Sequence, residues 1–257
     1  MAGEFLVPVL IWLAIIKVLQ LSIWPALDRT LGRLAPAAAY PASVLLFTLV
    51  SWYCALSGIP VPLALIPFAA AMIYAGSGRF YTKERLYSSF KWDIAFLIPF
   101  LFMLEVRWIN PAISSGEKFM DHAILASIMR QPIVPPLDPW YAGGRLDVYY
   151  YMGYWMNGAL GLVSGAPSTV AFNLALPTVL GLSVVSLYAL GHLILDRHRW
   201  LPVLALFIPN PSVIYHILIG DSWFDVLWGS TRTIENTINE YPLFSMLWGD
   251  VHPHVMS

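Results

Sequence analysis

The sequence predicts an all-α integral membrane protein, a polytopic bundle of about six transmembrane helices with one further helix lying in the membrane interface. Three observations support this prediction. Hydrophobic residues make up 58% of the chain and charged residues 11%, whereas soluble domains carry about 25% charged residues. Apolar runs that approach the roughly 20 residues needed to cross a bilayer recur along the chain. The eleven tryptophans suit a membrane protein, because tryptophan gathers at the two interfaces.

The apolar runs define the predicted transmembrane helices. Five of them are Phe5–Leu27, Pro36–Ser57, Ile59–Gly76, Ile94–Ile109 with its flanks, and Ser168–Leu195. Leu201–Ile219 is the sixth, and it contains Pro209-Asn210-Pro211 near its middle. Proline removes a backbone donor and clashes with the preceding turn. We therefore expect the sixth helix to be kinked or unwound at this point.

The sidedness of the chain depends on Tyr149–Val163, which would be only about 22 Å long as a helix. If this segment spans the membrane, the basic cluster at 197–199 falls on the opposite side from the earlier basic residues. If it lies flat in the interface, all three basic clusters share one side. The earlier clusters are Arg29 with Arg33, and Arg79, Lys83, Arg85 and Lys91. The positive-inside rule favours the flat helix.

This topology predicts a multi-pass protein of the cell membrane with its N-terminus outside. Two acidic loops, 110–167 and 220–257, then face outside, and the basic loops face the cytoplasm. Residues 1–93 form an accessory three-helix region, and residues 94–257 form the part that carries the motifs. The start Met1–Glu4 lacks the basic segment of a secretory signal, so we expect the first helix to be retained. The lipid bilayer is the expected partner, and a net charge of -1 gives no indication of nucleic-acid binding.

The first outer loop contains two acids, Glu117 and Asp121, four residues apart. On a helix this spacing places both carboxylates on one face, where they could hold a metal ion or act as a general base. A solvated helix start with capping acids is the alternative. Trp140, in Pro-Pro-Leu-Asp-Pro-Trp, is either an interfacial anchor on a rigid turn or part of a ligand-binding wall. Tyr149, Tyr150 and Tyr151 form either an interfacial belt or a surface for stacking against a sugar.

The second outer loop ends in Asp250-Val251-His252-Pro253-His254. Side chains two residues apart point to the same side of an extended chain, so Asp250, His252 and His254 offer three convergent ligands. Carboxylate with imidazole suits zinc or manganese. The alternative is a pair of exposed loop histidines.

Three charges fall within predicted helices: Lys17, Glu105 and Arg107. Charges inside a membrane are costly, so they tend to be paired or functional. For Lys17 we expect a structural pairing or snorkelling to the interface. Cys54 is the single cysteine, which excludes an intrachain disulfide.

Several separated motifs resemble one family. They are Gly-Glu-Lys-x-Met-Asp, Pro-Pro-x-Asp-Pro-Trp, Tyr-Tyr-Tyr, Thr-Ile-Asn-Glu-Tyr-Pro and Gly-Asp-x-His-Pro-His, within residues 94–257. Together they resemble the YYY-type membrane proteins, described as a domain of unknown function. That family is similar in layout to the C-type (GT-C) glycosyltransferases. The resemblance implies use of a polyprenyl-phosphate-linked sugar on the outer face of the membrane.

The resemblance also implies roles for individual residues. Glu117 matches the leading acid of the first-loop motif and is the catalytic base candidate, with Asp121 as the alternative because the usual adjacent Asp-Glu pair is absent. Arg232 would meet a donor phosphate, since a guanidinium fork matches phosphate oxygens. Substrate contacts are expected from Trp140, Tyr149, Tyr150, Tyr151 and Glu240. Asp250, His252 and His254 would hold a divalent metal (Mn, Mg or Zn) or the phosphate.

Two further expectations follow. Proteins of this kind continue through several more membrane helices, so we expect an N-terminal fragment, with a second chain as a candidate source of the missing C-terminal helices. The main functional hypothesis is a membrane glycosyltransferase. The rival is a non-enzymatic transporter or lipid-binding membrane scaffold, in which Lys17, Glu105 and Arg107 line a path.

Overall fold

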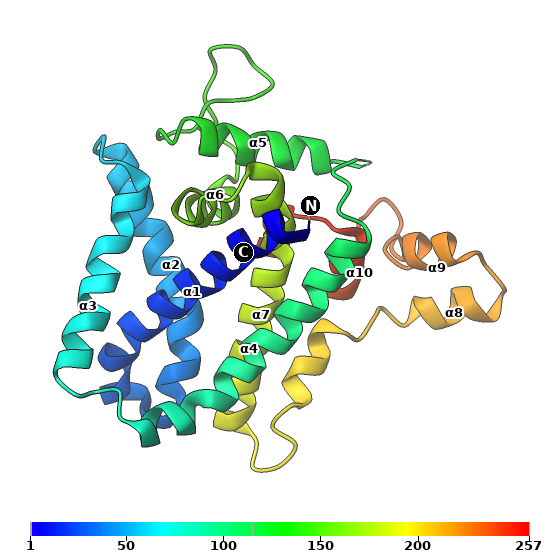
Figure 1. Cartoon of the computed structure of the whole chain (residues 1–257). Helices are drawn as coiled ribbons and strands as arrows, with labels where there is room; N and C mark the ends of the chain where they lie inside the picture. The colour runs from blue at the N-terminus through cyan, green and yellow to red at the C-terminus, as the bar shows by residue number, and fades with distance from the viewer. Residues whose placement is uncertain (1, 115, 257) are drawn as a thin grey trace.

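A computed structural model describes residues 2–114 and 116–256, and within them the chain is 71% helix with no β-strand. The first half contains α1 (Ala2–Leu31), η1 (Gly32–Leu34), α2 (Ala35–Leu56), η2 (Val61–Leu65), α3 (Ile66–Ser77) and α4 (Lys83–Ile109). The second half contains α5 (Lys118–Arg130), α6 (Met152–Ser164), α7 (Ser168–Ile194), η3 (Leu201–Leu206), α8 (Ser212–Leu218), α9 (Trp223–Gly229), α10 (Pro242–Trp248) and α11 (Pro253–Met256). The predicted all-helical fold class is confirmed (Figure 1).

The helices α1 and α2 form a tight hairpin around the short turn η1 (Figure 1). Small residues line the contact, since Ala35, Ala37 and Ala39 at the start of α2 are fully buried. The amide of Gln20 in α1 donates a 2.9 Å hydrogen bond to the carbonyl of Pro36. The amide nitrogen of this polar side chain thus has a backbone partner, whereas its Oε1 is buried without a hydrogen-bond partner among the described residues.

Helix α4 is longer than the sequence predicts. It begins at Lys83 because Thr82 caps it, with Oγ1 accepting a hydrogen bond from the backbone N–H of Arg85 at 3.3 Å. It then packs along α7 over most of its length. It also stacks on the N-terminal helices, where the rings of Phe96 and Tyr40 lie 4.8 Å apart. The predicted division at residue 93 stays a prediction.

Two helices lie across one end of this bundle. Figure 1 shows α6 end-on and α5 running sideways above it, whereas α2, α3 and α7 stand upright. The side chain of Trp155 in α6 is fully buried and donates a 3.0 Å hydrogen bond to Ser51 of α2. The predicted helix Tyr149–Val163 is thus found as the shorter α6, which begins at Met152 and lies transverse to α7. Its placement in a membrane interface stays a prediction.

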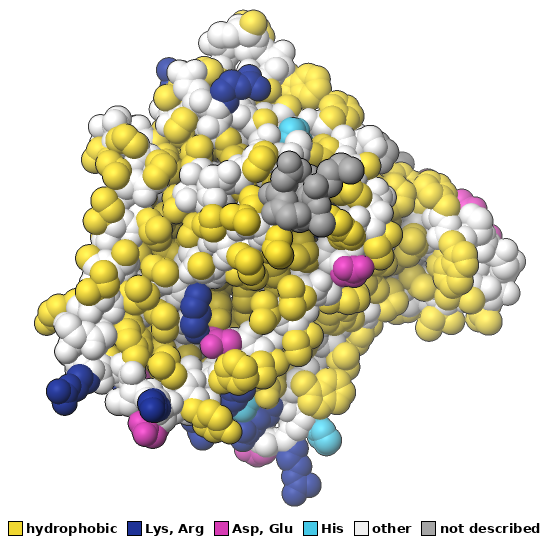
Figure 2. Space-filling model, in the orientation of Figure 1, with side chains coloured by type: hydrophobic (Ala, Val, Ile, Leu, Met, Phe, Trp, Pro, Cys, Tyr) yellow, Lys and Arg dark blue, Asp and Glu magenta, His cyan; other side chains and the backbone are white. Residues whose placement is uncertain are grey.

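The basic segments gather at the opposite end. Lys91 lies close enough to Arg33 and Arg199 for their charges to act on it, so residues from all three predicted basic clusters are neighbours. Figure 2 shows several Lys and Arg side chains along the lower edge of the molecule, below a broad apolar surface. Which side of a membrane this end faces stays a prediction.

Two helical stretches are long and apolar enough to cross a membrane by length and composition. They are Leu6–Leu56, which covers most of α1, η1 and α2 with a mean hydropathy of 2.3, and Ser168–Ile194, with 1.9. The sixth predicted run, Leu201–Ile219, is not one helix. It unwinds after η3 and resumes only at Ser212, because Pro209 and Pro211 deprive this stretch of two backbone donors. The count of six transmembrane helices stays a prediction.

Candidate functional site

Helix α5 positions the two acids of the first loop. Glu117 is the N-cap residue, and its carbonyl accepts the backbone N–H of Asp121 at 3.0 Å. Asp121 shares a helix face with Ile124, Leu125 and Ile128, which pack into the main core. The side chain of Asp121 is therefore 0% exposed, whereas that of Glu117 is 64% exposed. One acid is buried beneath the site and the other lies at its mouth.

A second segment reaches the site from the end of the chain. Helix α10 ends at Gly249, which has a φ of 75° and so adopts the left-handed conformation that favours glycine. Val251 follows and is 1% exposed, packed in a second core cluster with Phe172 and Met246. The backbone N–H of His252 donates to Asp250 Oδ1 at 3.1 Å. The turn and the buried valine fix Asp250 and His252 against α5.

The two segments meet at the imidazole of His252. Its Nε2 contacts Glu117 Oε2, and its Nδ1 contacts Asp250 Oδ1. Nδ1 also lies 3.6 Å from Asp121 Oδ2. Three carboxylates thus surround one histidine, although Glu117 and His252 are 135 residues apart in the chain. We call these four residues the carboxylate–histidine cluster.

Asp121 has one hydrogen-bonded oxygen and one without a partner. The phenol of Tyr154 in α6 donates to Oδ1 at 2.6 Å, while Oδ2 is buried and accepts no hydrogen bond from the described residues. Burial raises the pKa of Asp121 to about 6, with Asp250 and Glu117 adding to the rise and Tyr154 and His252 opposing it. This buried oxygen of Asp121 is therefore one that a further donor or a cation could satisfy.

The pKa of His252 is raised, whereas burial alone would lower the pKa of an imidazole. Its hydrogen bond to Asp250 raises the pKa of His252 to about 9; burial opposes this, and the charges of Asp250 and Asp121 and the contact with Glu117 support it. The imidazolium is therefore the form that these neighbours favour. A cation held between the carboxylates would serve the same electrostatic purpose.

Ligand atoms of Asp121, Asp250 and His252 all lie within 4.8 Å of one another, which fits a shared divalent ion. If Nδ1 binds the ion, Nε2–H can donate to Glu117, the usual way in which a carboxylate orients a metal-bound histidine. This ligand set includes Asp121, for which both a metal-binding and a general-base role were predicted from the sequence. The predicted extended register fails after His252, because Pro253 begins α11. The side chain of His254 lies outside the described part of the chain, so its role as a ligand stays a prediction.

The three tyrosines of the triplet lie in three different environments. Tyr149 lies near the cluster, because the charges of Asp121, Glu117 and Asp250 all act on it. Tyr150 is 77% exposed. The phenol oxygen of Tyr151 accepts a 3.1 Å hydrogen bond from Trp52 in α2. Only Tyr149 is placed to contact a ligand held at the cluster.

Trp140 lies near the start of α5. Its ring packs edge-on against Phe119, with centroids 5.8 Å apart, and 60% of the residue is exposed. Its backbone N–H donates to Asp138 Oδ1 at 2.8 Å, which closes the proline-rich turn. The tryptophan is thus presented on a fixed turn beside the helix that carries Glu117.

The remaining predicted substrate residues lie on other parts of the second loop. The guanidinium of Arg232 lies 4.1 Å from the ring centroid of Trp228 and bonds Thr231. The carboxylate of Glu240 accepts a 3.1 Å hydrogen bond from Ser245 and lines a separate cavity of about 230 Å³. Neither geometry resembles the tight grouping around His252.

Sequence reasoning missed Tyr154 and Lys118. Tyr154 is one of several aromatic residues before an apolar run, and only the packing of α6 on α5 brings it to Asp121. Lys118 is the third residue of the Gly-Glu-Lys motif, and it is 7% exposed. Lys17, by contrast, was expected to be paired, and its ammonium lies 2.7 Å from Asp93 Oδ1. That expectation is confirmed.

The apolar helical bundle, capped at one end by this polar cluster, defines a helical membrane protein. The chain belongs to the family described as uncharacterized membrane protein (DUF2298), whose family model matches residues 46–257. The match includes α4 to α11 and hence every residue of the cluster. No curated protein and no solved structure matches the chain.

Proposed function

We propose that the protein is a membrane glycosyltransferase that uses a polyprenyl-phosphate-linked sugar on the outer face of the membrane. The observation that carries the proposal is the convergence of Glu117 and Asp121 with Asp250 and His252 at one end of the bundle. Acids and imidazoles with shifted pKa values beside one another are typical of sites that move protons. The basic segments at the opposite end accord with a cluster on the outer side.

The two acids at the start of α5 differ in solvent exposure, and this difference gives them different roles. Glu117 is largely exposed, so an acceptor hydroxyl can approach its carboxylate, and Glu117 is the general base. The acceptor oxygen forms a bond to the anomeric carbon as its proton passes to Glu117. The bond between that carbon and the phosphate oxygen breaks, and polyprenyl phosphate leaves. Asp121 is fully buried and serves as a ligand or counter-charge beneath the reacting atoms.

A divalent ion fits this site on the evidence of Asp121 Oδ2, which is buried without a hydrogen-bond partner among the described residues. Asp121, Asp250 and His252 would hold it. Such an ion would neutralise charge that develops on the leaving phosphate. Tyr154 holds Asp121 in place through its 2.6 Å hydrogen bond.

The test is sugar transfer in membrane vesicles that contain the 257-residue chain. Radiolabelled mannosyl- and glucosyl-polyprenyl phosphates serve as donors, and labelled membrane products are counted. We expect Glu117→Gln to lower transfer by about 100-fold or more, because general base catalysis contributes about 10²–10⁴. Asp147→Asn, an exposed acid of the same loop, is the matched control and should leave transfer unchanged. Equal transfer by wild type and Glu117→Gln, or no transfer from either donor, would contradict the proposal.

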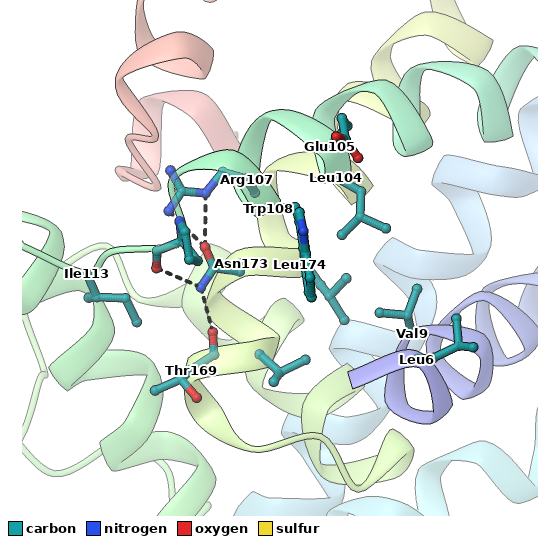
Figure 3. Close-up of a pocket in the computed structure, with 12 residues that line it drawn as sticks. Leu6, Val9, Leu104, Glu105, Arg107, Trp108, Ile113, Thr169, Asn173 and Leu174 are labelled. Atoms are coloured by element: carbon teal, nitrogen blue, oxygen red, sulfur yellow. Dashed lines mark hydrogen bonds between the residues drawn. The ribbon is translucent and has the colours of Figure 1, made fainter. Parts of the chain in front are cut away.

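The rival transporter hypothesis needs Lys17 and Glu105 on a polar path. Lys17 is instead engaged by Asp93, which also accepts a 2.7 Å hydrogen bond from Tyr40. Glu105 lies on the wall of a largely apolar groove (Figure 3). These contacts favour the enzyme over a path for polar solutes.

A further inference from the structure

A large groove opens beside the carboxylate–histidine cluster. It has a volume of about 840 Å³ and lies between the first turns of α1, the last turns of α4 and the first turns of α7 (Figure 3). Leu6, Val9, Leu104 and Leu174 form much of its wall, and Arg107 and Asn173 form its polar end. A groove that is apolar along its length and cationic at one end is complementary to a lipid with an anionic head.

Arg107 is held rigidly at that polar end. Its Nε and Nη2 both donate to Asn173 Oδ1, at 3.0 Å and 2.8 Å. The amide of Asn173 in turn donates to the carbonyl of Thr169 at 2.9 Å. Arg107 is 4% exposed. Because the amide of Asn173 is neutral, it does not balance the buried positive charge of Arg107. Buried charges are costly unless an opposite charge accompanies them.

The remaining nitrogen of Arg107 points toward Gly249 and a second buried cation. A β-carbon added to Gly249 would overlap Nη1 of Arg107 and lie 3.5 Å from Nζ of Lys118. Lys118 is 7% exposed, and none of the described residues accepts a hydrogen bond from its ammonium. Two buried cations thus converge beside a residue that has no side chain. Asp250 is near enough for its charge to act on Lys118, but it also contacts His252.

We propose that Arg107 and Lys118 bind the phosphate of a monophosphate lipid at Gly249, with its apolar tail in the groove. Arginine suits phosphate because its fork of N–H donors matches the oxygens, and lysine adds a point charge. Gly249 has no β-carbon, so the guanidinium of Arg107 can lie against its backbone and close to the ammonium of Lys118. Arg107 lies in both the groove and the cation pair, so the head and tail sites are continuous. This assigns the phosphate to Arg107 and Lys118 in place of Arg232.

The proposal deepens the proposed function, because the lipid would be the polyprenyl phosphate of the donor, and that link rests on the sugar-transfer hypothesis. Binding itself does not depend on transfer. The test therefore measures binding alone, with the purified chain in detergent and native mass spectrometry as the readout. The probes are undecaprenyl phosphate, undecaprenol and inorganic phosphate.

We expect the wild-type chain to bind undecaprenyl phosphate at least 10-fold more tightly than either undecaprenol or inorganic phosphate. Lys118→Met keeps the apolar stem but removes the charge, and should reduce that preference over undecaprenol to less than 3-fold. Leu104→Trp fills the groove and should weaken both lipids. Lys83→Met, an exposed lysine at the start of α4, is the matched control and should bind as wild type does.

Equal affinity of the wild type for undecaprenyl phosphate and undecaprenol would overturn the phosphate site, whether or not Lys118→Met folds. Equal affinity for undecaprenyl phosphate and inorganic phosphate would overturn the tail site. Lipid binding without sugar transfer would remove the proposed function and leave this inference standing. Sugar transfer by a chain that fails to prefer the phosphorylated lipid would overturn this inference and leave the proposed function standing.

Discussion

Two ionic clusters in this apolar bundle differ in how their charges are balanced. In the first, Lys17 meets Asp93 at 2.7 Å, and Tyr40 donates to the same carboxylate. One positive charge faces one negative charge, and a phenol satisfies a further lone pair. In the second, three carboxylates surround His252, and Asp121 Oδ2 has no hydrogen-bond partner among the described residues.

The difference separates a structural role from a ligand-binding one. A balanced pair in a membrane protein removes the cost of an isolated charge and needs nothing more. A cluster with excess negative charge and an orphaned buried oxygen is costly, and it persists where a ligand or a reaction uses it. The sequence shows both clusters as charged residues in or beside apolar runs, so only their three-dimensional balance distinguishes them.

The largest effect should come from the histidine at the centre of the second cluster. His252→Gln keeps a polar side chain but removes the imidazole that meets Glu117, Asp121 and Asp250. We expect sugar transfer in vesicles to fall by about 100-fold or more, with the amount of folded protein unchanged. His198→Gln, on the turn after α7 at the basic end, should transfer as wild type does. Similar transfer by both variants would remove His252 from the mechanism.

The balanced cluster should respond in stability and not in transfer. Lys17→Met leaves Asp93 without its cation, and we expect a loss of about 1–2 kcal/mol, since both side chains are partly exposed, at 34% and 27%. Thermal unfolding of the detergent-solubilised protein measures this loss. The double variant Lys17→Met/Asp93→Asn should recover part of it. A Lys17→Met protein with wild-type stability but no transfer would reverse the roles assigned to the two clusters.

The smallest effect should come from the phenol beneath Asp121. Tyr154→Phe removes the 2.6 Å hydrogen bond to Oδ1 and should lower the free energy of unfolding by about 1 kcal/mol. It should also reduce transfer by less than about 10-fold, because the carboxylate itself remains. Tyr150→Phe, at a 77% exposed position, should change neither quantity. Identical behaviour of the two variants would show that Tyr154 does not position Asp121.

Continuous apolar runs predicted the long helices correctly because a helix in lipid must be apolar over its whole length. α1, α2 and α7 follow their predicted runs closely. The start of α4 was missed because its first turns carry basic and polar residues, including Lys83 and Arg85, and were interpreted as a basic loop. Only the Thr82 cap marks the true beginning. The prediction of a single helix over Leu201–Ile219 was wrong. Two prolines two residues apart keep the backbone between η3 and α8 from forming a regular helix.

The acids and histidine of the candidate site could be named from short motifs, because Glu117, Asp121, Asp250 and His252 each stand near a loop end. Their mutual contacts could not be predicted, because they depend on the turn at Gly249 after α10 and on the packing of Val251, which together place this segment against α5. The proximity of Arg107 to Lys118 could not be predicted from the sequence for the same reason. It arises only where Gly249 brings the two cations together.

The central claim is that the two outer segments form one cation-binding site, and Mn²⁺ binding to the purified chain tests it most directly. Isothermal titration should be run on wild type, Asp121→Asn, His252→Gln and the double variant, with Asp147→Asn as the control. We predict one Mn²⁺ per wild-type chain, a loss of affinity of about 100-fold in each single variant, and no further loss in the double variant, because ligands of one ion are not independent. Strictly additive losses, or a wild-type chain that binds no Mn²⁺, would contradict the claim.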